Sequence, residues 1–210
     1  WMGGGYDHAG IHSIVVDPRD SRHVTLAVSC GGVWQTRDGG ESWTLTASGM
    51  KADYLPPENA DDGNAQDPHC MVQCAANPDV LWLQHHCGIY RIDRPSNTWV
   101  RIGKNMPVRV GDIGFPMVVH PRDPDTAWVF PMDGGTVWPR TSPDGRPAAY
   151  VTRNAGNTWQ RLDRGLPEAQ SWALGLEASG VAVEVLPLIQ IGPLADPSGI
   201  QAAWRRVPQH

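Results

Sequence analysis

Lysine and phenylalanine are scarce in this sequence of 210 residues, and no long uninterrupted apolar run occurs in it. Only two of the 17 cationic residues are lysines, and the formal net charge is −5. Nucleic-acid-binding surfaces need clustered positive charge, so we expect no nucleic-acid partner. The most apolar region, 172–195, is interrupted by two glutamates and two prolines, and no basic segment flanks it. We therefore expect no membrane span and no membrane-surface role.

Cysteine is also sparse, with four residues: Cys30, Cys70, Cys74 and Cys87. Cys70 and Cys74 fall within one predicted strand, where four residues of extended chain cover about 13 Å, too far for a disulfide between them. We expect free thiols, which suit a reducing compartment. The N-terminus has no charged start and no apolar signal core, and the sequence therefore favours a cytoplasmic location.

Glycine, proline and tryptophan are abundant, with 23, 19 and 10 residues, whereas only 19% of the residues are charged. This composition favours many short strands joined by tight turns over long helices. Ten tryptophans beside two phenylalanines are expected if a repeated unit needs one tryptophan in each copy.

An eight-residue motif with the pattern Ser/Thr-x-Asp/Asn-x-Gly-x-Ser/Thr-Trp recurs along the chain. It occurs at 36–43 and 152–159, and a degenerate copy at 92–99 keeps the Thr-Trp end but has Arg94 at the Asp position. The motif residues are Thr36, Asp38, Gly40, Ser42, Trp43, Thr98, Trp99, Thr152, Asn154, Gly156, Thr158 and Trp159.

The spacing of this motif has a physical explanation. A short Asp or Asn side chain accepts hydrogen bonds from the backbone of the turn that follows it, and the glycine supplies the positive φ that the chain reversal needs. The tryptophan is expected to start the next strand and to bury its ring against the sheet. Each copy is therefore predicted to be a hairpin turn with its own anchor.

Two further landmarks repeat in the same order. Upstream of each motif lie an aromatic residue in a predicted strand and, before it, a proline turn; these are Trp34, Tyr90 and Tyr150, and Pro18, Pro78 and Pro121. One unit therefore consists of four antiparallel strands, which is the composition of a β-propeller blade. The sequence predicts an all-β fold with three blades at about 11–47, 69–103 and 114–163. A β-solenoid and a β-sandwich are the alternatives.

The segments outside these units are expected to differ from them. Segment 48–68 is predicted to be a polar loop between blades, and 131–147 an insertion in the third unit. Residues 166–210 contain no turn motif, and we expect this tail to be a partial blade or not to encode native blade structure. Propeller rings close with about 4–8 blades, so three blades are expected to leave the ring incomplete, in a fragment of a longer protein.

The turn motifs resemble the Asp-box, or bacterial neuraminidase repeat, of sialidase-like and sortilin-like β-propellers. The similarity covers about 1–165, and it is strongest to bacterial proteins described as exo-α-sialidase-like or glycosyl-hydrolase-like repeat proteins. The resemblance implies that the Asp-box is a structural turn away from the central channel. Asp38 and Asn154 are accordingly expected not to be catalytic.

The same resemblance implies an arginine triad in true sialidases, with the first arginine in an Arg-Ile-Pro motif, together with a tyrosine nucleophile and its glutamate partner. This sequence contains no Arg-Ile-Pro, because Arg91-Ile92 and Arg101-Ile102 are followed by Asp93 and Gly103. No sialidase catalytic residue can be transferred to it, and a shared scaffold does not determine function. Catalytic residues therefore stay unassigned.

Propeller ligands usually bind at the channel mouth, where the loops before the innermost strands converge. The repeat register places one aspartate just before the first strand of each blade, with histidines beside these aspartates. We expect a polar binding mouth made from Tyr6, Asp7, His8, His12, Asp67, His69, His85, His86 and Asp112. The alternative is that these side chains cap turns or face solvent.

Two functions of different classes follow. The first is a non-catalytic propeller that binds a protein or glycan partner at the mouth. The second is a sialidase-like glycoside hydrolase, for which Asp7, Asp67 and Asp112 could supply the two carboxylates that flank the sugar in such enzymes. The oligomeric state stays open.

The sequence predicts no cofactor and no metal site. A zinc site drawn from Cys70, Cys74, His69 or His85 is disfavoured for two reasons. No paired Cys-x-x-Cys motif is present, and neighbouring residues of a strand point to opposite faces of the sheet.

Overall fold

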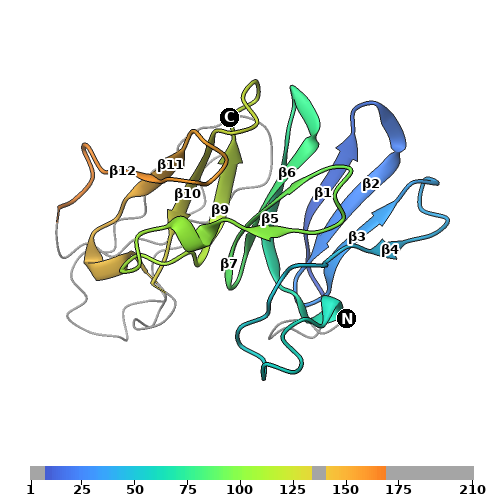
Figure 1. Cartoon of the computed structure of the whole chain (residues 1–210), viewed down its shortest axis with the longest axis horizontal. Helices are drawn as coiled ribbons and strands as arrows, with labels where there is room; N and C mark the ends of the chain where they lie inside the picture. The colour runs from blue at the N-terminus through green and yellow to red at the C-terminus, as the bar shows by residue number, and fades with distance from the viewer. Residues whose placement is uncertain (1–7, 134–140, 169–210) are drawn as a thin grey trace, which may run out of the picture.

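The computed structural model describes residues 8–133 and 141–168 of the chain. These residues form three four-stranded antiparallel sheets (Figure 1), which confirms the predicted all-β fold built from four-stranded blades. No helix in these two ranges is long and apolar enough to cross a membrane. The predicted tail beyond residue 168 lies outside the described residues, as do Tyr6 and Asp7.

Consecutive strands pair with one another in each sheet. The first sheet consists of β1 (Ile11–Asp17), β2 (Asp20–Val28), β3 (Gly32–Thr36) and β4 (Thr44–Leu45). The second consists of β5 (Pro68–Cys74), β6 (Asn77–His85), β7 (Gly88–Asp93) and β8 (Val100–Arg101). The third consists of β9 (Gly114–Val119), β10 (Ala127–Pro131), β11 (Ala149–Thr152) and β12 (Gln160–Leu162). The connections contain the 3₁₀ turns η1 (Gly63–Ala65), η2 (Gly103–Asn105) and η3 (Pro143–Gly145).

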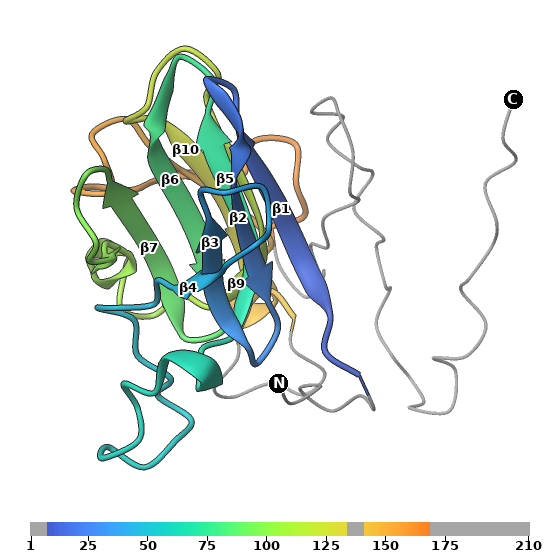
Figure 2. The ribbon, with the colours of Figure 1, turned by 90° about the vertical axis from the view of Figure 1, so that its right-hand side faces the viewer.

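The three sheets are arranged as adjacent blades. β5 contacts β1 on one side and β9 on the other, whereas β4, β8 and β12 form the far edges of their sheets. Figure 2 shows the first sheet in front of the second, with their faces turned toward each other. The first strands are therefore innermost, as in a propeller, and the three blades do not close a ring.

The strand β6 lies in the middle of the packing and is buried on both faces. Leu81 and Leu83 belong to the core shared with the first blade, whereas Val80 and Trp82 belong to the core shared with the third. Successive strand residues point to opposite faces, so a strand between two blades needs an apolar residue at every position. This requirement explains the continuous apolar run of this strand.

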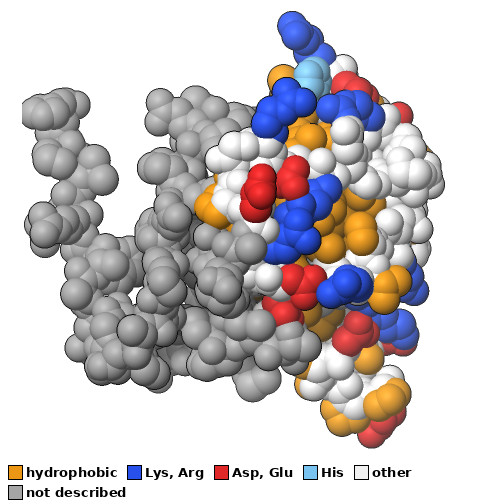
Figure 3. All heavy atoms as spheres, turned by 90° about the vertical axis from the view of Figure 1, so that its left-hand side faces the viewer, with side chains coloured by type: hydrophobic (Ala, Val, Ile, Leu, Met, Phe, Trp, Pro, Cys, Tyr) orange, Lys and Arg blue, Asp and Glu red, His pale blue; other side chains and the backbone are white. Residues whose placement is uncertain are grey.

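The outer sides of the first and third blades differ from this buried middle. Ile14 and Val16 of β1 are 63% and 48% exposed, because no described sheet packs on that face of the first blade. The third blade forms the left-hand side of Figure 1. There, charged side chains of both signs lie among hydrophobic ones (Figure 3). Burial is thus concentrated at the two joints between blades.

Asp38 organises the turn between β3 and β4 of the first blade. Its Oδ1 accepts hydrogen bonds from the Thr36 hydroxyl at 2.6 Å and from the Ser42 backbone N–H at 3.0 Å. The Thr36 hydroxyl accepts a hydrogen bond from the Gly40 backbone N–H at 2.9 Å, and Gly40 has a φ of 101°. The polar groups of this turn are therefore satisfied within eight residues.

Asn154 makes the equivalent contacts in the third blade. Its Oδ1 accepts hydrogen bonds from the Thr152 hydroxyl at 3.0 Å and from the Thr158 backbone N–H at 2.9 Å. The Thr152 hydroxyl accepts a hydrogen bond from the buried Gly156 backbone N–H at 2.9 Å. The two turns share one hydrogen-bonding pattern.

Replacing Thr152 with valine removes this hydroxyl at nearly constant volume. We expect the free energy of unfolding to fall by about 1–3 kcal/mol, because the buried Gly156 N–H loses its acceptor. Urea denaturation measures the change. The control Thr158→Val alters an exposed hydroxyl of the same turn, and we expect it to stay within about 0.5 kcal/mol of the wild type. Equal effects of the two substitutions would contradict this explanation.

The degenerate copy in the second blade uses Arg94 differently. Its guanidinium reaches across to the first blade, where it donates to the Thr25 hydroxyl at 3.0 Å and lies 3.4 Å from Asp17 Oδ2. Arginine at the Asp position thus replaces hydrogen bonds within the turn by contacts between blades.

The expectation that every motif tryptophan buries its ring is wrong for Trp43, which is 38% exposed. Trp99 is 3% exposed, and its indole N–H donates to the Thr46 carbonyl of the preceding blade at 2.7 Å. Trp159 is partly buried and packs against the core between the second and third blades. Trp99 and Trp159 therefore pack on the preceding blade, whereas no described sheet lies at the equivalent position to cover Trp43.

Candidate functional site

Asp67, His69 and His86 meet at the end of the blades opposite the turns that contain Asp38 and Asn154. This end lies at the lower edge of Figure 1, beside η1 and the loop that leads to it. Asp67 directly precedes β5, His69 lies in β5, and His86 directly follows β6. The antiparallel register pairs Pro68 with His85, so strand pairing brings the start of β5 to the end of β6.

The three side chains direct their polar atoms toward one point. Asp67 Oδ2 lies 3.3 Å from His69 Nε2 and 3.4 Å from His86 Nδ1. One potential ligand atom from each residue lies within 4.8 Å of those of the other two. The imidazole rings of His69 and His86 meet edge to face, with centroids 5.2 Å apart. The arrangement is compact and largely shielded, because Asp67 and His69 are each 8% exposed.

Asp67 is held by the first blade as well as by the histidines. Its Oδ1 accepts hydrogen bonds from the Ser29 hydroxyl at 2.8 Å and from the Cys30 backbone N–H at 3.1 Å. Burial alone would raise the pKa of Asp67, but the hydrogen bonds from His69, His86 and Ser29 hold this pKa well below its usual range. Asp67 is therefore a carboxylate at neutral pH.

His69 is fixed by the third blade. Its Nδ1 lies 2.8 Å from the Gly114 carbonyl oxygen, and its ring stacks on Phe115 with centroids 4.1 Å apart. A carbonyl oxygen can only accept a hydrogen bond, so Nδ1 carries the proton that it donates. The remaining nitrogen, Nε2, faces Asp67.

His85 has a different place from the one expected of a residue at the mouth. Its side chain is fully buried, and its ring nitrogens each lie 2.9 Å from a backbone nitrogen, that of Asp67 or that of Cys87. Burial lowers the pKa of His85 to about 3, so the ring is neutral at physiological pH. His85 shapes the loops around the site and cannot meet a ligand, because strand pairing turns its side chain into the protein.

Asp112 also lies apart from the expected mouth surface. Both of its oxygens accept hydrogen bonds from Arg101, each at 2.9 Å, and Arg101 further pairs with Asp53 at 2.6 Å. A Cβ placed on Gly88 or Gly103 would come within 3.0 Å or less of this carboxylate, so the surrounding backbone encloses it closely. Asp112 therefore ties the second blade to the loop that precedes the third.

The first blade contributes the histidines expected there. His12 is exposed on β1, and its ring centroid lies 6.1 Å from that of His69. Partial burial and the nearby His69 lower the pKa of His12. His8 is exposed just before β1, and Tyr6 and Asp7 fall outside the described residues. His12 thus borders the site from the side that solvent reaches.

Sequence reasoning missed four residues of this site: Ser29, Cys30, Tyr54 and Phe115. Ser29 and Cys30 form the β2–β3 turn, which is equivalent to the β6–β7 turn that carries His86 in the next blade. Aligning these turns of the repeat would have drawn attention to them. Tyr54 lies edge-on to His86 with ring centroids 5.3 Å apart, and no repeat signal identifies a residue in an inter-blade loop.

The grouping resembles neither a nucleophile with its base nor a pair of carboxylates around a sugar. One carboxylate and two imidazoles can bind a cation, or can donate and accept hydrogen bonds with a polar ligand. Tyr54, 45% exposed, adds an aromatic edge next to His86. None of the four cysteines forms a disulfide, and the thiols of Cys70 and Cys74 lie near backbone carbonyls of the third blade rather than in this group.

No protein-family profile and no curated protein match the chain. Solved structures do match. A GH74 enzyme described as ancestral has 18% sequence identity and a TM-score of 0.58 over 77% of this chain and 21% of its own. The GH74 xyloglucanase from Xanthomonas campestris has 17% identity and a TM-score of 0.51 over 73% of this chain and 21% of its own. YCF48 from Cyanidioschyzon merolae has 18% identity and a TM-score of 0.48 over 72% of this chain and 39% of its own.

These similarities concern the scaffold. The chain spans about a fifth of the length of the two GH74 structures, at identities below a fifth. Identity at this level shows a shared fold and no shared activity. The described residues form part of a β-propeller built from four-stranded antiparallel blades.

Proposed function

We propose that this chain is a non-catalytic propeller module that binds a protein or glycan partner at the end of the blades that carries Asp67, His69 and His86. The observation that carries the proposal is the fixed polar group itself. Side chains and backbone from three blades hold it in place, and His86, His12 and Tyr54 border it where solvent has access. A preorganised polar group beside an exposed aromatic ring is typical of a recognition site.

The geometry supports binding over glycoside hydrolysis. A glycosidase needs a carboxylic acid with a raised pKa and a second carboxylate facing the same sugar. The pKa of Asp67 is lowered, so this group is a poor proton donor at neutral pH. Asp112 has both oxygens engaged by Arg101. Within the described residues, these two aspartates therefore do not form a catalytic pair.

The chemistry of the site is compatible with two kinds of partner. Imidazole and carboxylate groups form hydrogen bonds with sugar hydroxyls and with peptide groups alike. Tyr54 can stack on the apolar face of a sugar ring or on a peptide side chain. The test therefore includes both classes.

The chain, labelled with a fluorophore, is applied to arrays of glycans and of peptides, and the dissociation constant of each hit is measured. We expect Tyr54→Ala and His12→Ala to weaken binding by at least about tenfold, because about 1.4 kcal/mol of lost contact corresponds to that factor. The control is Arg22→Ala, an exposed residue at the opposite end of the first blade, and it should bind like the wild type.

Two outcomes would contradict this function. One is a hit whose affinity is the same for all three variants, since the partner would then bind elsewhere. The other is release of the aglycone from aryl glycosides, including sialosides, by the wild-type chain, since this would be catalysis.

A further inference from the structure

We propose that Asp67, His69 and His86 form a binding site for one divalent transition-metal ion of the zinc type. The ligand atoms are Asp67 Oδ2, His69 Nε2 and His86 Nδ1. Uptake of the ion needs only this chain, so the proposal does not depend on the partner proposed above.

The distances between ligand atoms suit a tetrahedral ion. Zinc lies about 2.0–2.1 Å from histidine nitrogen and carboxylate oxygen, so two of its tetrahedral ligands lie about 3.3–3.4 Å apart. Asp67 Oδ2 lies 3.3 Å from His69 Nε2 and 3.4 Å from His86 Nδ1. Two edges of the coordination tetrahedron are thus already formed, and the third is no longer than 4.8 Å.

Two of the ligands are oriented by their other polar atoms. His69 donates from Nδ1 to the Gly114 carbonyl, which leaves Nε2 directed at the site. Asp67 accepts from Ser29 and Cys30 at Oδ1, which leaves Oδ2 for the ion. Metal-ligating histidines and carboxylates in proteins are commonly fixed by such outer hydrogen bonds.

The electrostatics of the group also call for a cation. Asp67 Oδ2 lies 3.3 Å from His69 Nε2, so a cation placed between these two atoms would be attracted by the carboxylate and would have an imidazole nitrogen as a second ligand. His86 directs Nδ1 at the same oxygen, and one metal ion would contact all three atoms.

The donor set indicates the kind of metal and its coordination. Two imidazole nitrogens and one carboxylate oxygen suit zinc and its neighbours better than magnesium or calcium, which prefer oxygen ligands only. Three protein ligands leave a fourth position for water or for a group of a bound molecule. His12, exposed 6.1 Å from the His69 ring, borders the site from the first blade.

The test uses the purified chain after treatment with a chelator. Zinc chloride is titrated by calorimetry, and cobalt chloride is added as a spectroscopic probe. We expect one ion per chain, visible cobalt bands of a tetrahedral site, and no near-ultraviolet band of a cobalt–thiolate bond. Bound zinc should also raise the melting temperature of the chain, because ligands that bind the folded state stabilise it.

Variants assign the ligands. Asp67→Asn and His86→Ala should weaken zinc binding by more than about 100-fold, since the loss of even an outer partner of a ligand costs about 10–100-fold. The control is His120→Ala, which alters a partly exposed histidine at the other end of the third blade and should bind zinc like the wild type. Circular dichroism checks that each variant is folded.

Three results would overturn the proposal: a folded wild type that takes up no zinc, binding that persists in both ligand variants, or a cobalt–thiolate band lost in Cys30→Ser. The two proposals can fail independently. The partner proposal is tested with Tyr54→Ala, which removes no proposed metal ligand, so zinc uptake can be observed even if no partner binds.

Discussion

Trp82→Ala is expected to lower the free energy of unfolding by about 3–5 kcal/mol, the cost typical of emptying the site of a large buried aromatic ring. The indole is fully buried in the core between the second and third blades. Its N–H donates to the Pro124 carbonyl at 3.0 Å, and the Arg91 guanidinium lies 5.2 Å from the ring centroid. The substitution removes packing and a hydrogen bond across one blade joint, and a cation–π contact within the second blade.

Chemical denaturation with urea measures this effect through the midpoint and the slope of the transition. The matched control is Trp43→Ala, because Trp43 is 38% exposed and lies on the uncovered side of the first blade. We expect it to cost no more than about 1 kcal/mol. Similar losses for the two tryptophans would show that the blade joint does not dominate the stability of the described residues.

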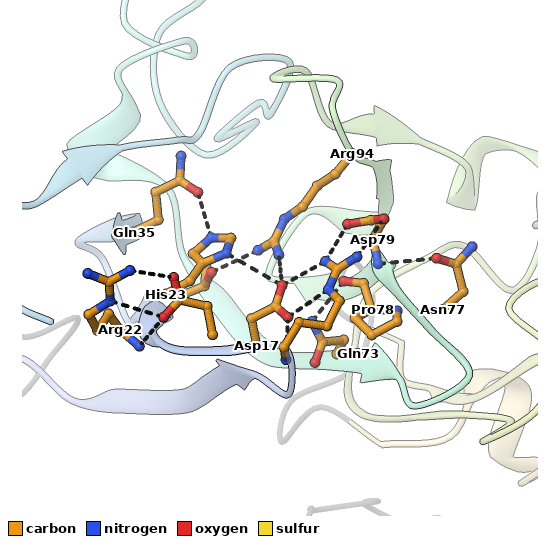
Figure 4. A network of polar contacts seen from close by, with 12 residues as sticks. Asp17, Arg22, His23, Gln35, Gln73, Asn77, Pro78, Asp79 and Arg94 are labelled. Carbon is orange, nitrogen blue, oxygen red and sulfur yellow. Dashed lines mark hydrogen bonds and ion pairs between the residues drawn. The ribbon is translucent and has the colours of Figure 1, made fainter. Parts of the chain in front are cut away.

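Asp17→Asn is expected to cost about 3 kcal/mol, since removal of one partner leaves the others of a buried ionic network uncompensated. Asp17 is 4% exposed at the β1–β2 turn and pairs with Arg19 at 2.8 Å, with Arg94 at 3.4 Å and with His23 at 3.5 Å. Figure 4 shows this network, in which side chains of the second blade meet the turn of the first. Asparagine keeps the shape but not the charge.

The network joins two blades through two arginines. Arg19 pairs with Asp17 in its own blade and with Asp79 in the second blade, the latter at 2.6 Å. Arg94 comes from the degenerate motif of the second blade and donates to Thr25 in the first. The loss of Asp17 therefore weakens the joint between the first two blades at the end that carries the Asp38 turn, away from the candidate site.

The same carboxylate predicts a dependence of stability on pH. Hydrogen bonds from Arg19 hold the pKa of Asp17 far below its usual range. A group with a lowered pKa in the folded state contributes stability above its unfolded pKa, near 3.9, and this contribution is lost as the pH falls below about 5. The wild type should lose stability below pH 5 more steeply than Asp17→Asn.

Urea denaturation of both proteins between neutral and acidic pH measures this difference. Asp61→Asn is the control, because Asp61 is 68% exposed and pairs with Lys51 at the surface, where ion pairs contribute little. The free energy of unfolding of Asp61→Asn should change with pH in parallel with that of the wild type. If Asp17→Asn also runs parallel to the wild type, protonation of Asp17 is not the cause of the loss of stability at low pH.

Much of the architecture could be predicted because its signals are local. The turn at Asp38 satisfies its own polar groups within eight residues, so its chemistry is visible in the sequence wherever a copy occurs. The recurrence of such turns with a proline turn and an aromatic strand indicated four-stranded units, and four-stranded antiparallel sheets are what the structure contains. Successive side chains of β6 enter the two cores alternately, as the two-residue period of a β-strand predicts.

The candidate site was only partly visible in the sequence. Asp67, His69 and His86 were selected as members of a polar mouth, but their convergence depends on the register that pairs Pro68 with His85. His85 and His86 are neighbours, yet one is fully buried and the other borders the site, because strand pairing turns consecutive side chains to opposite sides. Ser29 and Gly114, which orient two of the side chains, come from the adjacent blades.

The repeated turns, the strand pattern and the all-β class of this protein follow from its local sequence, since each depends on hydrogen bonds and side-chain alternation within a few residues. Packing between blades sets which tryptophan is covered, which residues Arg94 contacts, and that one carboxylate and two imidazoles converge. These outcomes depend on contacts between blades that are dozens of residues apart, and no local pattern encodes such contacts.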